Sequence, residues 1–294
     1  MVTITPPVNS TPSLSPGART TTRIAIVLVA AVLTVGTVVS LGAAAWGLST
    51  LRVIADTKEL PAAMRELVID TGDIPAAVRV TTDRDATAPR VELRLLKSER
   101  VGEHTLNVAA DGPSARVTVN GADAPFLRWG RAGELTVTLP PELARRLSVT
   151  TRQQEGVLFA QADVGELIAR GTDGAVVLSG SARRIEIHNQ NGSVVAMKPI
   201  SVSESFLADT VDGDIEVDFA AAAPQRVEAT TNNGDVRLGL PGGPYLVRAT
   251  GADADVEVPV TSDPAQAVAE VTARSDDGSV VVAGPRGEAF HRHR

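Results

Sequence analysis

The chain has 294 residues, of which 43% are hydrophobic, 21% charged and 3% aromatic, and it contains no cysteine. The absence of cysteine excludes a disulfide framework, a zinc knuckle and a thiol nucleophile. The formal net charge of −7 argues against nucleic-acid binding, because neutralising phosphates requires a surplus of Lys and Arg.

Residues 1–23 are rich in Pro, Ser and Thr and have no sustained apolar pattern, so we expect a disordered cytoplasmic tail. The run 24–51 has no charged residue and is long enough to cross a membrane as one helix. We expect it to be an uncleaved transmembrane signal anchor. A cleaved signal peptide is the alternative, because residues 43–45 are all alanine.

Charge sets the expected orientation of this span. Arg19 and Arg23 precede the run and no acidic residue does, so the positive-inside rule places the N-terminus in the cytoplasm. The predicted location is therefore the cell membrane, with the C-terminal portion extracytoplasmic. We expect a juxtamembrane linker over 52–66, an extracytoplasmic β-repeat domain over 67–283 and a flexible C-terminal tail over 284–294.

Short turns recur through the second half at intervals of ~20 residues. When the turns are aligned on their fourth residue, apolar residues occupy every second flanking column and polar residues lie between them. A turn at 251–254 is aligned in the same way, which places Val256 and Val258 in two apolar columns. This alternation predicts strand–turn–strand units that each bury one face. The glycines at the structural turn positions are Gly156, Gly174, Gly192, Gly213, Gly234 and Gly278.

Two arrangements fit these units: an antiparallel meander, or a β-solenoid in which like residues stack on like. One apolar column is largely alanine, with Ala169, Ala208, Ala229, Ala249 and Ala273. Small residues at one register are expected where a thin coil closes around its own axis, so we favour the solenoid. The predicted fold class is all-β: a β-solenoid or β-helix-like stack of ~20-residue units, preceded by one transmembrane helix.

The segments 133–140 (GELTVTLP) and 147–151 (LSVTT), followed by repeated Thr-x-x-Gly-Asp-Val-type units, resemble a family of bacterial β-strand-repeat domains. That family carries the name "putative adhesin" and has no known function. The resemblance covers about 67–283 and implies the β-repeat fold of a membrane-anchored protein, but it says little about activity. It brings no catalytic or binding residues with it.

Acidic residues near the turns, including Asp212, Asp214 and Asp235, invite comparison with calcium sites. Calcium needs six to eight converging oxygens, and the Asp column is interrupted, so turn formation is the better explanation. His188 lies on the outward register beside Glu186, without a second ligand or a nucleophile at a usable spacing. We therefore expect no catalytic residue, no metal site and no cofactor.

Phe126, Arg128, Trp129 and Arg131 form the one local aromatic cluster, and they are the weak candidate for a binding patch. The alternative is that this cluster caps the open end of the β stack. Self-association is a further possibility, through the ends of the stack or through outward apolar residues. Those outward residues are Ile168, Val177, Val195, Leu207 and Val281.

These features predict a non-enzymatic, single-pass, extracytoplasmic protein with a contact role in adhesion or in organising the cell envelope. The expected partners are the membrane and either a cell-envelope polymer or another membrane protein, but not nucleic acid. A membrane-tethered regulator or sensor in envelope-stress signalling is the alternative. A polysaccharide-active β-helix enzyme is disfavoured by the shortage of aromatic residues and the lack of a convergent acid/base pair.

Overall fold

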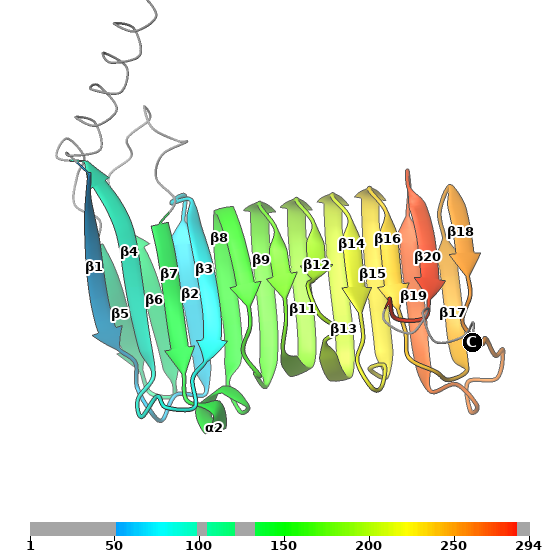
Figure 1. Ribbon diagram of the computed structural model, residues 1–294, viewed down its shortest axis with the longest axis horizontal. Helices are drawn as coiled ribbons and strands as arrows, with labels where there is room; N and C mark the ends of the chain where they lie inside the picture. The colour runs from blue at the N-terminus through cyan, green and yellow to red at the C-terminus, as the bar shows by residue number, and fades with distance from the viewer. Residues whose placement is uncertain (1–50, 99–104, 121–132, 287–294) are drawn as a thin grey trace, which may run out of the picture. The chain divides into compact units, whose positions relative to one another are not determined.

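The computed structural model describes residues 51–98, 105–120 and 133–286. The chain divides into two units, 1–52 and 53–294, and nearly all described residues belong to the second. Among the described residues there are 20 strands and one short helix (Figure 1). They are β1 (Leu51–Glu59), β2 (Glu66–Gly72), β3 (Ala76–Thr82), β4 (Arg90–Ser98), β5 (Thr105–Asp111), β6 (Ser114–Asn120), β7 (Gly133–Leu139), α2 (Pro141–Ala144), β8 (Ser148–Ala160), β9 (Glu166–Asp173), β10 (Val176–Leu178), β11 (Ser181–Asn191), β12 (Val194–Ala196), β13 (Ser201–Asp212), β14 (Ile215–Asp218), β15 (Arg226–Asn233), β16 (Val236–Gly239), β17 (Tyr245–Thr250), β18 (Asp253–Val256), β19 (Ala269–Ser275) and β20 (Ser279–Ala283).

The strands form two ladders. Ladder A runs in the spatial order β1, β4, β7, β3, β8, β10, β12, β14, β16, β20 and β18. Ladder B runs in the order β5, β6, β2, β8, β9, β11, β13, β15, β19 and β17. The long strand β8 belongs to both, because its first half pairs with β2 and β9 and its second half with β3 and β10. The result is one continuous 20-stranded sheet, nearly closed around a single core.

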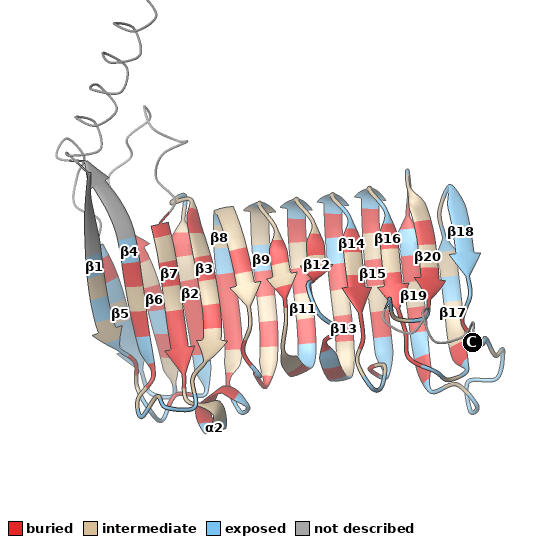
Figure 2. Ribbon diagram, viewed as in Figure 1, coloured by how far each residue is buried: buried red, intermediate tan, exposed pale blue. Residues whose placement is uncertain are grey.

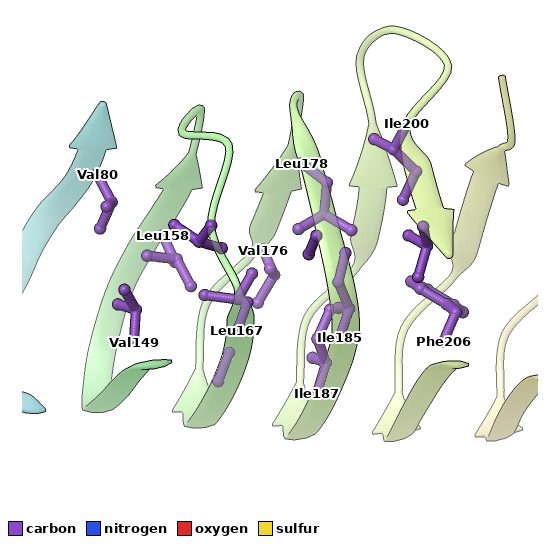
Figure 3. Packing of buried hydrophobic residues seen from close by; sticks show 14 of the residues in the cluster. Val80, Val149, Leu158, Leu167, Val176, Leu178, Ile185, Ile187, Ile200 and Phe206 are labelled. Atoms are coloured by element: carbon purple, nitrogen blue, oxygen red, sulfur yellow. The ribbon is translucent and has the colours of Figure 1, made fainter. Parts of the chain in front are cut away.

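The core lies between the two ladders and runs along the whole sheet (Figure 2). Leu167 and Ile185 project inward from ladder B, and Val176 and Leu178 project inward from ladder A (Figure 3). Strand burial alternates between buried and partly exposed residues, as in β9 and β16. This alternation follows from the two-residue period of strands, and each fully buried Val, Leu or Ile contributes about 1.5–3 kcal/mol.

In the repeated half the strands pair in parallel with the equivalent strand of the next repeat. Val176 pairs with Val194, and Val194 with Ile215. This pairing excludes the antiparallel meander for β8 to β20. The apolar columns of the sequence correspond to rows of the sheet, with one exception: Ala254 pairs with Val280, and Val256 with Val282. The alignment at 251–254 is therefore wrong by two residues, because that turn is shorter than the others.

The predicted fold class, a β-solenoid or β-helix-like stack of ~20-residue units preceded by one transmembrane helix, is wrong. The described strands belong to one sheet whose spatial order departs from sequence order at both ends. Strand β2 lies between β6 and β8, and β3 lies between β7 and β8. At the other end, β19 lies between β15 and β17, and β20 lies between β16 and β18. Strands β4 and β7, and likewise β5 and β6, pair antiparallel. Repeat alignment could not predict this, because equivalent coils present the same apolar columns to either neighbour.

One segment expected to flank the repeat domain contains a strand of the sheet. Within 52–66, where the sequence predicts a juxtamembrane linker, the structure has most of strand β1, which pairs with β4. The predicted span 24–51 lies outside the described residues apart from Leu51, the first residue of β1. No helix in the described part of the chain is long and apolar enough to cross a membrane.

Candidate functional site

The turn glycines stack on one another along one edge of the sheet. Gly192 has φ 136°, and a Cβ atom there would lie 1.9 Å from the carbonyl oxygen of Gly174 in the preceding coil. Gly213 and Gly234 are placed in the same way, with φ 153° and 146°. Because the backbones approach this closely, only glycine fits the column. The glycines of this edge therefore have a structural role.

A column of polar side chains supports the glycine column from the inward register. Asn189 donates to the carbonyl oxygen of Gly174 at 2.7 Å, and Thr231 donates to that of Gly213 at 2.9 Å. Thr210 and Ser275 make the equivalent bonds at 3.2 and 2.7 Å. These side chains satisfy carbonyls that would otherwise be buried without a partner. The sequence analysis missed this column, although polar residues in an inward register were the signal for it.

The turn aspartates act on the backbone of the neighbouring coil. The Asp214 carboxylate accepts the backbone N–H of Asp235 at 2.9 Å, and the Asp235 carboxylate accepts the N–H of Ser279 at 2.8 Å. The bonds from the Ser279 N–H and hydroxyl lower the pKa of Asp235. Among the described residues, no three His, Asp or Glu side chains are placed to hold a metal ion. Asp214 and Asp235 thus connect the turns of neighbouring strands.

The outer face of ladder B carries charged side chains across neighbouring strands. Arg184 of β11 lies 3.5 Å from Glu166 of β9 and 3.7 Å from Glu204 of β13. Arg170 and Glu186 pair at 3.7 Å between β9 and β11. Further along the same face, Arg226 pairs with Glu228, and Arg248 with Glu270. Opposite charges are thus interspersed on a surface that spans β9 to β17 and is open to solvent.

His188 is part of this outer face. Its Nε2 lies 2.9 Å from Glu186 Oε1, and its Nδ1 lies 3.7 Å from Asp209 Oδ2. The imidazole therefore lies between two carboxylates of adjacent strands. The other histidines, His104, His291 and His293, lie outside the described residues.

The outer face of ladder A is apolar around β8, β10 and β12, unlike the charged outer face of ladder B. Phe159, Val177 and Val195 occupy one row across these strands and are each partly exposed. The guanidinium of Arg79 lies 4.8 Å from the centre of the Phe159 ring, which is a cation–π contact at one end of the row. Met197 follows β12 and is 70% exposed. The predicted outward positions Val177 and Val195 are thus confirmed as outward-facing.

A small hollow lies beneath these strands in the described part of the chain. A hollow of about 20 Å³ is lined by Val80, Leu167, Leu178, Ile185 and Ile200. The labelled side chains in Figure 3 surround this region. Such a volume holds roughly one water molecule, which is far below the size of a ligand pocket.

The predicted aromatic patch of Phe126, Arg128, Trp129 and Arg131 lies outside the described residues. A contact that the sequence analysis did not anticipate involves Arg286, in the segment expected to be a flexible tail. Its Nε donates to Asp218 Oδ2 at 3.1 Å, and the guanidinium also binds Glu216. No motif in the sequence indicated this contact, because its partners lie on β14, 68 and 70 residues earlier in the chain.

No known protein-family description matches the chain, and no curated protein does. Solved structures with a similar arrangement include a putative cell adhesion protein from Clostridium sporogenes, with 10% identity, 79% of this chain and 100% of that chain covered, and a TM-score of 0.34. A putative adhesin from Parabacteroides merdae has 10% identity, coverage of 79% and 96%, and a TM-score of 0.42. A putative lipid binding protein from Parabacteroides distasonis has 11% identity, coverage of 77% and 96%, and a TM-score of 0.33. Several neighbours thus carry the name that the sequence resemblance suggested, but the likeness is too low to assign a function.

Proposed function

We propose that the protein is a non-catalytic contact protein of the cell envelope, and that the outer face of ladder B is its contact surface. The observation that carries this proposal is the array of interspersed Arg and Glu side chains on that face. They lie on parallel strands that are held in fixed register by the core behind them. A rigid backbone keeps such a surface organised before a partner arrives, which lowers the entropy cost of binding.

The ion pairs on this face contribute little to folding. The side chains of Arg184 and Arg226 are 52% and 67% exposed, and exposed ion pairs are typically worth about 0–1 kcal/mol. Each of these side chains can therefore leave its ion-pair partner on the same face and bind a charged or hydroxyl group of a ligand, at a small cost in folding free energy. A partner that suits such a surface is a polar polymer or protein that makes many weak contacts. Its binding should weaken with salt, because exposed charges are screened.

The cellular location stays a prediction from the sequence. It rests on the uncharged run 24–51 and on Arg19 and Arg23 before it, and apart from Leu51 these residues lie outside the described part. Extraction and protease-accessibility experiments on intact cells would test whether residues 53–294 face outward.

Co-sedimentation of residues 51–294 with insoluble cell-envelope material, over a range of salt concentrations, tests the contact role. This fragment contains every strand of the described sheet. We expect retention at low salt that falls gradually as salt rises. The triple variant Arg170→Ala, Arg184→Ala and Arg226→Ala should lose most of the retention. The matched control removes three arginines elsewhere, Arg90→Ala, Arg94→Ala and Arg237→Ala on ladder A, and should be retained like the wild type.

Two results would contradict the proposal. Equal loss in both triple variants would mean that ladder B has no special part in binding. A fragment that stays in the supernatant at every salt concentration would exclude contact with an insoluble envelope polymer. The membrane-tethered regulator would then be the better hypothesis, with another membrane protein as the partner.

A further inference from the structure

A row of ionisable side chains crosses the outer face of ladder B. Arg152 of β8 pairs in register with Arg170 of β9, and Arg170 pairs with His188 of β11. Asp70 of β2 precedes these three residues in the row, and Asp209 of β13 follows them. Buried residues alternate with the row along each strand, so all five side chains lie on the outer side of the sheet. Two arginines and a histidine thus occupy consecutive strands about 4.8 Å apart.

Arg152 differs from the other arginines on the strands of this face, because it has no ion pair in the described part of the chain. The carboxylate of its neighbour Asp70 lies 3.9 Å from Arg116. Like charges on neighbouring strands repel, so the adjacent positions of Arg152 and Arg170 are unfavourable. An anionic group bound between the two guanidinium groups would remove that repulsion. Arginine suits such a group, because its planar fork binds two oxygens of a carboxylate or phosphate.

Arg170 shares its carboxylate partner with His188. Glu186 Oε1 lies 3.7 Å from a guanidinium nitrogen of Arg170 and 2.9 Å from His188 Nε2. On the other side of the ring, His188 Nδ1 lies 3.7 Å from Asp209 Oδ2. A neutral imidazole has one N–H and donates to only one of these carboxylates, whereas an imidazolium donates to both. Protonation of His188 therefore strengthens its hold on Glu186 and weakens that of Arg170.

We propose that Arg152 and Arg170 form an anion-binding subsite for the carboxylate or phosphate groups of a polymer, and that protonation of His188 strengthens this subsite. The inference rests on the proposed contact role of ladder B, and it identifies the partner of that surface as anionic. The free guanidinium group of Arg152 and the partly released group of Arg170 hold the anion. Their strands are fixed in register by the core, so the two groups stay side by side.

The charges around the imidazole give the pH dependence its sign. The charged groups that face His188 are Glu186 on its own strand, Arg170 on β9 and Asp209 on β13. Together with Arg152 these groups carry no net charge while the imidazole is neutral, and protonation adds one positive charge. Histidine commonly titrates between about pH 5 and pH 8. Binding of an anion therefore strengthens as the pH falls through this interval.

Retention of the full-length protein on immobilised anionic polymers tests the subsite. Polygalacturonate supplies carboxylates and poly(glycerol phosphate) supplies phosphodiesters, and both polymers stay ionised between about pH 5.5 and about pH 7.5. Neutral dextran is the reference matrix. We expect several-fold more retention at the lower pH than at the higher pH, and little on dextran. The anionic polymer that retains more protein identifies the preferred ligand as a carboxylate or a phosphate.

Single variants separate the parts of the site. Arg152→Ala should lose most of the retention at both pH values, because one arginine alone remains. His188→Gln cannot take up a proton and should show the weaker retention at both pH values. Glu186→Gln releases Arg170 and should show the stronger retention at both. Arg237→Ala, on the outer face of β16 in ladder A, is the matched control and should behave like the wild type. Urea unfolding midpoints close to that of the wild type would show that each variant is folded.

Two results would overturn this inference. Wild-type retention that does not change with pH would mean that His188 does not control the subsite. Equal losses in Arg152→Ala and Arg237→Ala would mean that the anion is attracted by the chain in general. Either result would leave the contact role standing if insoluble envelope material still retained the protein. Conversely, pH-dependent retention on an anionic polymer without retention on envelope material would support the subsite and contradict the envelope partner.

Discussion

The middle of the sheet and its C-terminal end are built from similar strands but are stabilised differently. In the middle, β14 and β16 have coils on both sides, and their inward residues are fully buried. At the end, β18 has a neighbour on one side only, and all four of its residues are exposed. Val260 and Val268, in the segment after β18, are also exposed. Strands β14 and β16 therefore bury their inward residues where strands pair with them on both sides, whereas the edge strand β18 does not.

At the C-terminal end of the sheet, the loop between β18 and β19 covers part of the outermost strand. The segment between β18 and β19 returns to the outermost strand: the Tyr245 N–H donates to Pro259 at 2.9 Å, and the Thr261 N–H donates to Tyr245 at 2.9 Å. The Val268 N–H donates to Pro244 at 2.9 Å. These bonds occupy part of the open edge of β17, and Asp253 and Asp255 place charges on the edge of β18. Covered and charged edges of this kind resist pairing with other chains.

The largest expected difference between the two regions concerns glycine. Gly192→Ala in the middle would place a Cβ atom 1.9 Å from Gly174 O at a φ of 136°. We expect a loss of roughly 3–6 kcal/mol in the free energy of unfolding, because strain and steric overlap add. Gly242→Ala before β17 has no atom within 4 Å of the new methyl group. It should change stability by less than about 1 kcal/mol. Urea unfolding of both variants measures the difference, and equal losses would contradict it.

A smaller effect is expected in the polar column that supports the glycines. Thr231→Val removes the hydroxyl that donates to the Gly213 carbonyl at 2.9 Å, and it leaves that carbonyl buried without its partner. The expected cost is about 1–2 kcal/mol in the free energy of unfolding. Thr230→Val, one residue earlier on the outward register, is the matched control and should be nearly neutral. If Thr231→Val were also neutral in urea unfolding, the column would have no stabilising role.

The sequence was sufficient to predict which side chains form rows across the strands in the middle of the sheet. It was not sufficient to predict the spatial order of the strands at the ends of the sheet. Ala169, Ile187, Ala208 and Ala229 fall in one predicted column and in one row of ladder B. That prediction works because strand alternation is local. The position of β19 between β15 and β17 is not local, because both β17 and β19 present the same alanine and valine columns. Only the longer loop before β19 differs, and its length alone does not determine spatial order.

Some residues of the outer faces could likewise be predicted from the sequence, and others could not. The charged rows on ladder B follow from strand alternation once the pairing is known, so Arg170 and Glu186 could be placed outward from the sequence. The bond between Arg286 and Asp218 could not be predicted, because Arg286 lies outside any periodic segment. It depends on the space at Gly239, which is a property of strand neighbours rather than of the local sequence.

The smallest expected effect lies at the junction between the two regions, where Asp235 of the turn before β16 accepts two bonds from Ser279 of β20. Because these bonds lower the pKa of Asp235, the folded state favours the carboxylate more than the unfolded state does. The resulting stability is present above the unfolded pKa of about 3.9 and is lost as the pH falls through the lower folded pKa. In Asp235→Asn the side-chain oxygen still accepts these bonds but does not titrate. We therefore expect nearly unchanged stability at pH 7 and a shallower loss of stability below about pH 4.

Urea unfolding midpoints between neutral and strongly acidic pH measure this slope. Asp255→Asn on β18 is the control, because the Asp255 side chain has no hydrogen-bond partner within the described part of the chain. An acid slope that is the same in wild type and Asp235→Asn would mean that Asp235 does not couple β16 to β20. A shallower slope in Asp235→Asn alone would show that this carboxylate joins the regular middle to the inserted coil. The stability of the end would then depend on pH through a single turn.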